Sequence, residues 1–488
     1  MIQSPLLDPI AGYIAGQWVD ADSAARVDVT NPATGEVLAS VPAMGAEETG
    51  RAIAAAQAAL ATIPDIETRR QWLQQANDAL LANKKEIGRI LCMEHGKPWP
   101  EAQGEVEYAA SFFDYYARTM VDILAPEHLP GEFKGCTWSV HKRPIGVVGL
   151  ITPWNFPIAM IAKKLAPALA AGCPSVIKPA KDTPLTMVAL FRILHDHLQL
   201  PAGMVNLVMG NAGKIGGALM GSPTVRMVSF TGSTEVGQLL LEQSRADVKK
   251  LGLELGGNAP FIVCDDADID GAIDGLMANK FRGAGQTCVC ANRVYVHTAV
   301  YDEFAQKLFE RVNALKVGNG MDEGVDIGPL INAAGFEKVR EHVADALARG
   351  AHLKAGPRPD ELDAARSLLY PPSVLTEVTH DMRCCQEETF GPLVPLIRFD
   401  DDAKVIEQAN DTSFGLAAYL YTQDEQRAAW FMERLHFGHC GYNTGMGPAA
   451  HTPFGGMLTS GLGREGGHEG LLEYVELQTI PQGISRAS

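Results

Sequence analysis

The middle of the chain alternates between short apolar runs and segments whose apolar residues recur at helical spacing. The apolar runs are expected to be strands at 145–151, 175–178, 205–208 and 225–230. Helices are expected between them, one from about Pro157 to Ala171 and one capped by Asp182 or Thr183, with Pro184 in its first turn. Strands joined by helices at this spacing pair in parallel. The alternation therefore predicts an α/β fold with a doubly wound sheet.

Further elements flank this alternation. Outside it we expect helices at 46–61 and 67–85, a strand at 260–264, and a second set of alternating α/β elements from 268 to about 438. Residues 122–143 contain proline and glycine, and they are expected to be irregular, to end in a strand at 137–141 and to leave the compact body. The segment 471–480 is expected to be an amphipathic strand that pairs outside its own domain.

The composition argues against several classes of protein. A formal net charge of −17 leaves no basic field to hold the phosphates of a nucleic acid or an acidic membrane. The N-terminus lacks the charged and apolar regions of a signal peptide, and proline and glycine interrupt the apolar stretch 165–177. Nine cysteines, an odd number, do not indicate a disulfide framework. We therefore expect a cytoplasmic protein without a nucleic-acid or membrane partner.

Cys288 follows a run of small residues, Gly283-Ala-Gly-Gln-Thr-Cys288. A substrate can approach a thiol closely where there is so little bulk, and the thiolate is a strong nucleophile. A free cysteine is, however, more often a small buried hydrophobe. Taken alone, the stretch favours this simpler interpretation, so a nucleophilic Cys288 needs partners elsewhere in the chain.

Four features could supply such partners. Asn155 lies between two prolines in Thr152-Pro-Trp-Asn-Phe-Pro157, and a rigid amide donor is what the oxyanion of a tetrahedral intermediate requires. Glu254 is a lone carboxylate among apolar residues, and such a group is usually paired or functional. The segment Gly232–Gly237 opens a helix and could bind a phosphate or form a simple turn. Lys178 ends a strand and could equally be solvated.

Six motifs follow one another along the chain: Thr152-Pro-Trp-Asn-Phe-Pro, Phe230-Thr-Gly-Ser-Thr-Glu-Val-Gly, Glu254-Leu-Gly-Gly-Asn, Gly285-Gln-Thr-Cys288, Glu388-Thr-Phe-Gly-Pro and Pro453-Phe-Gly-Gly. In their sequence and in this order, they resemble the motifs of the NAD(P)-dependent aldehyde dehydrogenase superfamily, and the similarity covers essentially the whole chain. Within it, Cys288-Val-Cys290 and Ser460-Gly-Leu-Gly-Arg-Glu-Gly466 are most similar to succinate-semialdehyde dehydrogenases.

The resemblance implies a role for each partner of Cys288. Cys288 would attack the aldehyde carbon, and Asn155 with the Cys288 backbone N–H would hold the oxyanion. Hydride would leave for the nicotinamide, and Glu254 would activate the water that hydrolyses the thioester. Lys164 would belong to a proton relay. Covalent catalysis suits this oxidation, because a thiohemiacetal can expel hydride whereas a free aldehyde cannot.

The resemblance also places residues at the cofactor. These are Trp154, Lys178, Lys181, Gly232, Ser233, Leu255, Glu388 and Phe390. Lys181 stands where NAD-preferring relatives often carry a glutamate that repels a 2′-phosphate, so the charge is reversed and NADP is favoured, with NAD also used. Alternatively, Lys181 extends into solvent. No metal is expected, because His195-Asp-His197 has no further ligand spacing around it.

The residues expected to contact the substrate match the resemblance only in part. Arg282 matches an arginine that grips the carboxylate of succinate semialdehyde. Lys163 stands where a second arginine is expected, which keeps the charge but loses the bidentate fork. The segment 448–451 lacks the serine expected before Pro453. A semialdehyde such as succinate semialdehyde is therefore the expected substrate, and a longer ω-oxo acid or another polar aldehyde is the alternative.

Other interpretations remain open for the cysteines and for the class of protein. Cys290 could form a regulatory disulfide with Cys288 or simply pack beside it. A cysteine hydrolase or thioesterase would need a histidine base, and none lies between Glu254 and Cys288. A catalytically silent structural protein would not need Cys288, Glu254 and Asn155 together.

The length of 488 residues predicts two or three domains. From the resemblance we expect a Rossmann-like cofactor-binding domain at 1–121, 144–253 and 448–470, and a second α/β catalytic domain at 254–447. A small β oligomerisation element is expected at 122–143 and 471–488, which would make the protein a homodimer or homotetramer.

Overall fold

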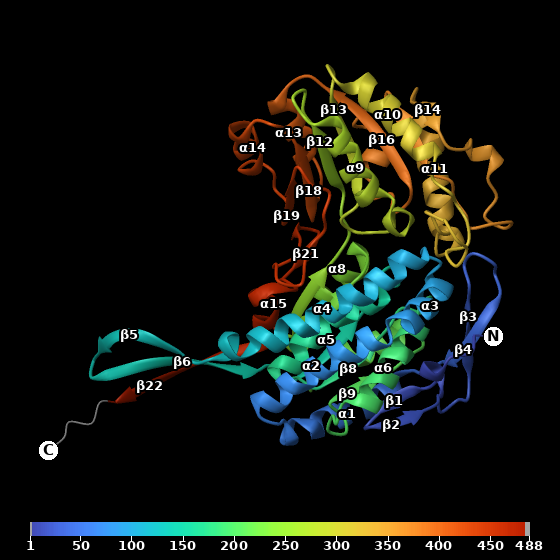
Figure 1. Cartoon of the computed structure of the whole chain (residues 1–488). Coiled ribbons are helices and arrows are strands. Elements are labelled where there is room, and N and C mark those ends of the chain that lie inside the picture. The colour runs from blue at the N-terminus through green and yellow to red at the C-terminus, as the bar shows by residue number, and fades with distance from the viewer. Residues whose placement is uncertain (1, 484–488) are drawn as a thin grey trace.

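A computed structural model describes residues 2–483 and contains two large sheets (Figure 1). The first sheet has the strand order β2-β1-β9-β8-β7-β10-β11-β21. Its strands are β1 (Gly12–Ile14), β2 (Gln17–Val19), β7 (Val147–Ile151), β8 (Ser175–Lys178), β9 (Val205–Leu207), β10 (Val225–Thr231), β11 (Lys250–Glu254) and β21 (Gly461–Leu462). The strands from β9 to β11 pair in parallel, and antiparallel strands close both edges.

Helices cover both faces of this sheet. On one face, apolar side chains of α1 (Ala46–Ala59), α7 (Ala212–Gly221) and α8 (Thr234–Ser244) pack on the strands. On the other face lie α5 (Pro157–Ala171) and α6 (Leu185–His197), with α2 (Ile66–Ala82), α3 (Lys84–His95) and α4 (Trp99–Leu124) in the same core. Because most residues of the parallel strands are buried between the two helical layers, apolar side chains predominate in them, and β7 is wholly apolar. The predicted doubly wound sheet is thus confirmed.

The second sheet forms the upper lobe in Figure 1, with the order β14-β15-β16-β13-β12-β18-β19. Its strands are β12 (Ala259–Val263), β13 (Ala291–His297), β14 (His352–Ala355), β15 (Ser373–Thr376), β16 (Leu393–Phe399), β18 (Ala417–Tyr421) and β19 (His439–Tyr442). The accompanying helices are α9 (Ile269–Lys280), α10 (Tyr301–Asn313), α11 (Ala333–Ala348), α12 (Arg383–Gln386), α13 (Asp402–Asn410) and α14 (Glu425–Met432). A separate apolar core lies within this lobe. The predicted second α/β unit is confirmed, whereas the exact domain boundaries stay a prediction.

Two small pairs of strands lie outside the large sheets. They are β3 (Arg26–Thr30) with β4 (Val37–Pro42), and β17 (Phe414–Gly415) with β20 (Met457–Leu458). Both pairs are antiparallel.

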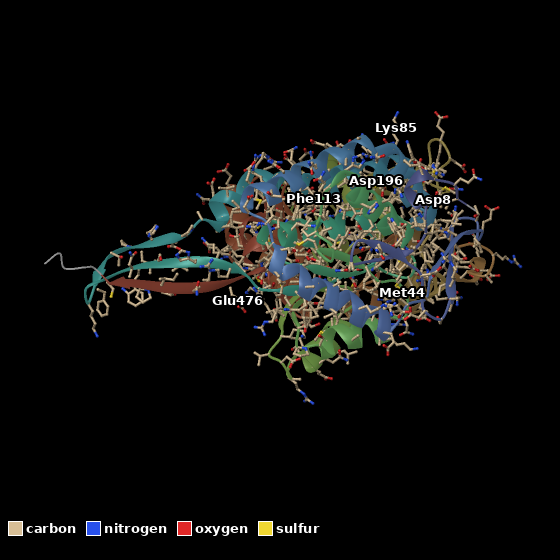
Figure 2. The ribbon with its side chains drawn as sticks, turned by 90° about the horizontal axis from the view of Figure 1, so that it is seen from below. Asp8, Met44, Lys85, Phe113, Asp196 and Glu476 are labelled. Carbon is tan, nitrogen blue, oxygen red and sulfur yellow. The ribbon has the colours of Figure 1, made fainter. Side chains whose placement is uncertain are left out.

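A three-stranded arm projects from the body in both views (Figures 1 and 2). It consists of β5 (Glu127–Phe133), β6 (Cys136–Pro144) and β22 (Val475–Gly483), and β22 pairs antiparallel with β6 along its whole length. The strand expected at 137–141 is confirmed within β6, whereas the expectation of irregular chain before it was wrong, because α4 is followed by strand β5. The tail strand also starts later than expected. It begins at Val475, because the expected first residue, Leu471, lies within α15 (Gly467–Leu472). Residues 484–488 of the predicted oligomerisation element lie outside the described residues.

The start of α6 differs from the expectation as well. The N-cap position is Pro184, which offers no side-chain acceptor within the described chain, and neither Asp182 nor Thr183 caps the helix. Instead the buried Glu94 carboxylate, near the end of α3, accepts the backbone N–H groups of Leu185 (2.7 Å) and Thr186 (2.8 Å). Burial raises the pKa of Glu94 to about 8. This cap was not predictable locally, because its acceptor lies some ninety residues earlier in the chain.

Replacing Glu94 by alanine should destabilise the protein. Glu94→Ala leaves two buried backbone donors of α6 without an acceptor, which should lower the free energy of unfolding by about 2 kcal/mol or more. The measurement is unfolding in urea. The matched control is Asp196→Ala, which breaks the surface pair with Arg192 on the same helix and should cost less than about 1 kcal/mol. Equal losses in the two variants would show that Glu94 is not the cap.

Candidate active site

Cys288 lies where two cavities of the structure meet. It follows the 3-10 turn Arg282–Gly285 and precedes β13, and it lines one cavity of about 450 Å³ and another of about 480 Å³. Gly285 has a φ of +75°, and a Cβ there would lie 2.3 Å from the Gly391 carbonyl oxygen, so only glycine fits. Gln286 fixes the loop, because it donates to the Gly283 carbonyl (2.9 Å) and accepts from the Ile331 N–H (2.9 Å).

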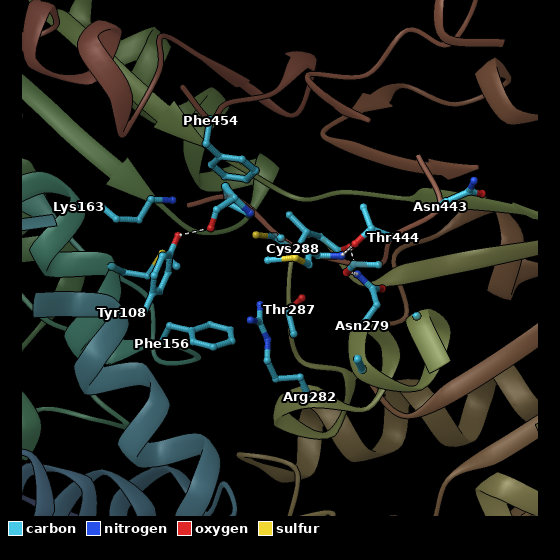
Figure 3. Close-up of a pocket in the computed structure, with 18 of the residues that line it drawn as sticks. Tyr108, Phe156, Lys163, Asn279, Arg282, Thr287, Cys288, Asn443, Thr444 and Phe454 are labelled. Carbon is cyan, nitrogen blue, oxygen red and sulfur yellow. Dashed lines mark hydrogen bonds between the residues drawn. The ribbon is translucent and has the colours of Figure 1, made fainter. Parts of the chain in front are cut away.

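The first cavity carries two cations beside Cys288. Lys163 of α5 and Arg282 approach Cys288 from different sides (Figure 3). The Lys163 Nζ lies 4.3 Å from the centre of the Phe454 ring, and the Arg282 guanidinium lies 4.9 Å from that of Phe156. Within residues 2–483, the Arg282 side chain makes no hydrogen bond or ion pair. The cavity therefore offers an uncommitted guanidinium to an anionic group.

The second cavity brings together most of the residues expected at the cofactor. It is lined by Trp154, Asn155, Gly232, Ser233, Leu255, Glu388 and Phe390. Gly232 and Ser233 connect β10 to the N-terminus of α8, where backbone N–H groups and the helix dipole favour a phosphate. The buried Thr231 Oγ1 and Asn155 Oδ1, whose residues line this cavity, have no hydrogen-bond partner within the described part of the chain. A wall with a helix N-terminus, unused polar atoms and aromatic rings fits a dinucleotide.

Two further side chains shape this cavity. Glu388 accepts the Gly257 N–H through its Oε1 (2.9 Å), and burial raises the pKa of Glu388 to about 7. Phe390 has a φ of +56° and meets Trp154 edge to face, with ring centres 5.5 Å apart. Both rings are thereby held at the wall, although left-handed backbone is uncommon for a bulky residue.

Lys178 and Lys181 lie elsewhere. They line a third cavity of about 960 Å³, beside Gly210, Asn211 and Lys214, and Cys288 does not line it. Lys178 is buried at the end of β8, and burial lowers its pKa, whereas Lys181 is exposed. The structure thus brings most of the expected cofactor residues to Cys288 and places these two lysines apart from them.

Asn155 contacts the loop that carries Cys288. Its Nδ2 donates to the Gln286 carbonyl oxygen at 3.0 Å. Because a carbonyl oxygen can only accept, this contact fixes the orientation of the amide. The other amide hydrogen remains available to a reacting oxygen atom.

Glu254 and Lys164 belong to a buried cluster of charges. Lys164 Nζ donates to Ser229 Oγ (3.0 Å) and to Glu465, and Glu465 lies 3.3 Å from Lys163 Nζ. Glu254 ends β11 and lines a small cavity with Lys163 and Glu465. Glu254 lines neither of the two cavities that Cys288 lines.

The pKa values in this cluster are displaced in opposite directions. Burial and the charge of Glu465 raise the pKa of Glu254 well above its usual value. Burial alone would also raise that of Glu465, but the charges of Lys164 and Lys163 hold the pKa of Glu465 below its ordinary range. Burial raises the pKa of Cys288 to about 12, and the charge of Lys163 partly opposes this shift. The thiol is therefore protonated near neutral pH, and a base must remove its proton.

Several residues of the site gave no usable signal in the sequence. Glu465 stands in a glycine-rich motif without an obvious task. Tyr108 of α4, which donates to the Pro448 carbonyl (2.9 Å), looks like an ordinary aromatic residue, and the motif that contains Phe454 does not indicate what its ring contacts. Only the folded chain shows that Tyr108 and Phe454 line the cavity of Lys163 and Arg282.

The remaining candidates have simpler environments. Cys290 is buried, with its Sγ 3.5 Å from the Ala291 carbonyl oxygen, and all nine cysteines of the chain are free. His195 contacts the Tyr13 hydroxyl at 3.0 Å. In the described range, no group of three or more His, Cys, Asp or Glu residues is arranged to hold a metal ion. The residues lining the two cavities at Cys288 include no histidine within 2–483, which argues against a cysteine hydrolase.

Comparison with known proteins identifies the family. The sequence model of the "Aldehyde dehydrogenase family" matches residues 18–480. The chain is 48% identical to succinate-semialdehyde dehydrogenase [NADP(+)] GabD of Escherichia coli over 96% of this chain and 97% of the relative. It is 47% identical to glutarate-semialdehyde dehydrogenase of Pseudomonas putida over 96% of each. A crystal structure of an oxidoreductase from Marinobacter aquaeolei matches 99% of this chain and 100% of its own with a TM-score of 0.97 at 58% identity. The resemblance read from the motifs is confirmed: the chain is an oxidoreductase that belongs to the aldehyde dehydrogenase family.

Proposed function

We propose that this aldehyde dehydrogenase oxidises a semialdehyde such as succinate semialdehyde to the dicarboxylate. The observation that carries the proposal is the pair of cations, Lys163 and Arg282, that share one cavity with Cys288. An aldehyde whose far end is a carboxylate can reach the free guanidinium while its carbonyl lies at the thiol. The semialdehyde names of the two curated relatives support this choice.

A longer ω-oxo acid is the second candidate. Pro448 lines the cavity without a side-chain donor, and Lys163 is shared with Glu465, so Arg282 is the dominant anchor. A single anchor specifies the distance to the carboxylate less strictly than three would. The glutarate-semialdehyde relative supports the longer chain length.

Each step of the proposed reaction can be assigned to residues of this chain. Cys288 gives its thiol proton to a solvent water molecule in the cavity, and its Sγ then bonds to the aldehyde carbon. The resulting oxyanion accepts hydrogen bonds from the free Asn155 N–H and the Cys288 backbone N–H. A nicotinamide dinucleotide, when bound, supplies the hydride acceptor, and the acyl group remains on Cys288 as a thioester. Glu254 then removes a proton from the water that attacks this thioester, which requires its carboxylate to turn from Glu465 toward Cys288. Lys164 and Glu465 hold the position from which it turns.

We further propose how the cofactor is selected. Trp154, Gly232, Ser233, Leu255, Glu388 and Phe390 would hold the dinucleotide at the second cavity. Lys181 and Lys178 would lie at the adenosine end, where positive charge favours the 2′-phosphate of NADP. The NADP(+) in the name of the Escherichia coli relative supports this preference.

The assembly and the location are proposals as well. The arm exposes Phe133 (61%) and Leu477 (67%), and a second copy could cover them in a homodimer or homotetramer. Nine free thiols fit the reducing cytoplasm. Among the helices at 2–483, none is long and apolar enough to span a bilayer.

Replacing Glu254 should separate the two half-reactions. Glu254→Gln should still give about one equivalent of reduced cofactor per site, because acylation of Cys288 remains possible, and then lose steady-state turnover by about 100-fold or more. Since the pKa of Glu254 is raised, its base form grows with pH, so the wild-type steady-state rate should rise from pH 6 to pH 9. Rapid-mixing absorbance at 340 nm measures both. Cys288→Ala should give neither burst nor turnover, and a native rate in that variant would refute the mechanism.

Removing the Arg282 guanidinium should reduce selectivity for acidic aldehydes. Arg282→Ala should lower kcat/KM for succinate semialdehyde by about 10- to 100-fold, since a hydrogen bond to a charged group is worth about 1.5–3 kcal/mol. Butanal, which has the same chain length without the carboxylate, is the matched control and should change little. Steady-state rates across semialdehydes of increasing length also distinguish the two substrate candidates. Equal losses on butanal and semialdehyde would count against a carboxylate pocket.

Reversing the charge of Lys181 should shift the cofactor preference. Lys181→Glu should lower kcat/KM for NADP by about 10-fold or more and leave the value for NAD nearly unchanged, because only NADP carries the 2′-phosphate. Lys404→Glu on the distant α13 makes the same charge change and should affect neither. An unaltered ratio of the two constants in Lys181→Glu would mean that Lys181 extends into solvent.

A further inference from the structure

We infer that the buried ion pair Lys97–Glu105 positions Asn155, the oxyanion donor of the proposed reaction, on which this inference rests. Lys97 precedes α4 and is 1% exposed. Its Nζ donates to Glu105 Oε2 at 2.5 Å and to the backbone carbonyl oxygen of Asn155 at 2.8 Å. Lys97 therefore holds the residue whose amide faces the Cys288 loop, and it does so from the backbone side.

Glu105 holds the other end of the same short segment. Its second oxygen, Oε1, accepts the backbone N–H groups of Ile158 (3.0 Å) and Ala159 (3.3 Å) in the first turn of α5. Phe156, at the N-cap position of α5, gives no side-chain cap within the part of the chain described. The carboxylate of α4 thus replaces the missing cap, and the ion pair fixes the chain on both sides of Phe156.

The ring of Phe156 adds a third point of contact. It lies 4.1 Å from Lys97 Nζ and 4.9 Å from the Arg282 guanidinium. The cation that anchors Asn155 and the cation offered to the substrate therefore use one aromatic ring. A shift of this segment would move the oxyanion donor and the substrate anchor together.

The face of helix α4 that carries Glu105 also contacts two further loops of the site. Glu101 Oε2 accepts the Gly283 N–H at 2.7 Å, next to Arg282, and Tyr108 donates to Pro448 at 2.9 Å. Glu101, Glu105 and Tyr108 are spaced by four and three residues, so they share one face of the helix. This face of α4 is a common support for the loops that carry Asn155, Arg282 and Pro448.

A buried ion pair at this place indicates that Lys97 and Glu105 position Asn155, rather than only stabilise the fold. Two buried charges lose their hydration, and apolar residues of the same volume often stabilise a core equally well. Directed hydrogen bonds, in contrast, specify where a backbone carbonyl lies. Asn155 needs this, because it lies in irregular chain between β7 and α5 and an oxyanion donor acts only when it is preorganised.

A double-mutant cycle tests the inference. Lys97→Met keeps the length of the side chain and removes both hydrogen bonds, so kcat for the best semialdehyde should fall by about 10- to 100-fold, with a small change in KM. In an Asn155→Ala background, where the donor is already absent, the same replacement should lower kcat by less than about threefold. Lys97→Arg should recover part of the wild-type rate. Lys84→Met, which breaks the exposed pair between Lys84 and Glu107 of α4 (2.7 Å), is the matched control and should leave kcat unchanged.

A second readout separates positioning from general damage to the site. Iodoacetamide alkylates Cys288 by displacing iodide and builds no oxyanion, so its rate in Lys97→Met should match the wild-type rate. Should Lys97→Met not fold, Glu105→Gln provides the same cycle, since it removes the charge that holds Lys97. Equal losses of kcat in both backgrounds, or an alkylation rate that falls with kcat, would overturn the inference. Wild-type protein that reduces neither NAD nor NADP with any aldehyde would instead overturn the proposed function.

Discussion

The hydrogen bond from Asn155 Nδ2 to the Gln286 carbonyl oxygen joins the two halves of the site. Asn155 follows β7 of the first sheet, whereas Gln286 and Cys288 precede β13 of the second. Neither sheet contains both the proposed oxyanion donor and the proposed nucleophile, so the proposed chemistry requires the two sheets to be docked. The same bond uses one amide hydrogen and thereby directs the other. Positioning of the donor therefore depends on the whole tertiary arrangement, including the contacts from α4.

Charge is distributed unevenly between the surface and this interior. The chain carries a formal net charge of −17, yet the cavity at Cys288 presents two cations. One of them, Lys163, also neutralises Glu465, so a substrate carboxylate and Glu465 compete for one amine. Glu254 belongs to the same cluster and keeps a raised pKa because burial disfavours its charge and the nearby Glu465 carboxylate repels it. Binding of an anion and protonation of the base are consequently linked through Lys163.

The sequence predicted the parts of the protein that follow from local patterns. The composition and the spacing of apolar residues indicate buried parallel strands and amphipathic helices. The doubly wound sheet and α5 were therefore predicted with nearly correct bounds. Residues such as Cys288 and Asn155 were found through motifs. Contacts between distant segments were missed: the cap of α6 comes from Glu94, the cap of α5 from Glu105, and the partner of Lys164 is Glu465. No local window contains both members of such a pair, and glutamates on amphipathic helices usually face solvent.

The order of these contacts along the chain has a consequence for biosynthesis. Glu254 pairs with Gly461 at the edge of the first sheet, and Lys164 binds Glu465, so both depend on residues that the ribosome adds much later than Glu254 and Lys164 themselves. A nascent polypeptide that has emerged only as far as residue 450 already carries Cys288 and Asn155, but its base has neither neighbour. Glu254 and Lys164 therefore gain these neighbours only once residues 461–465 have packed beside β11 and α5.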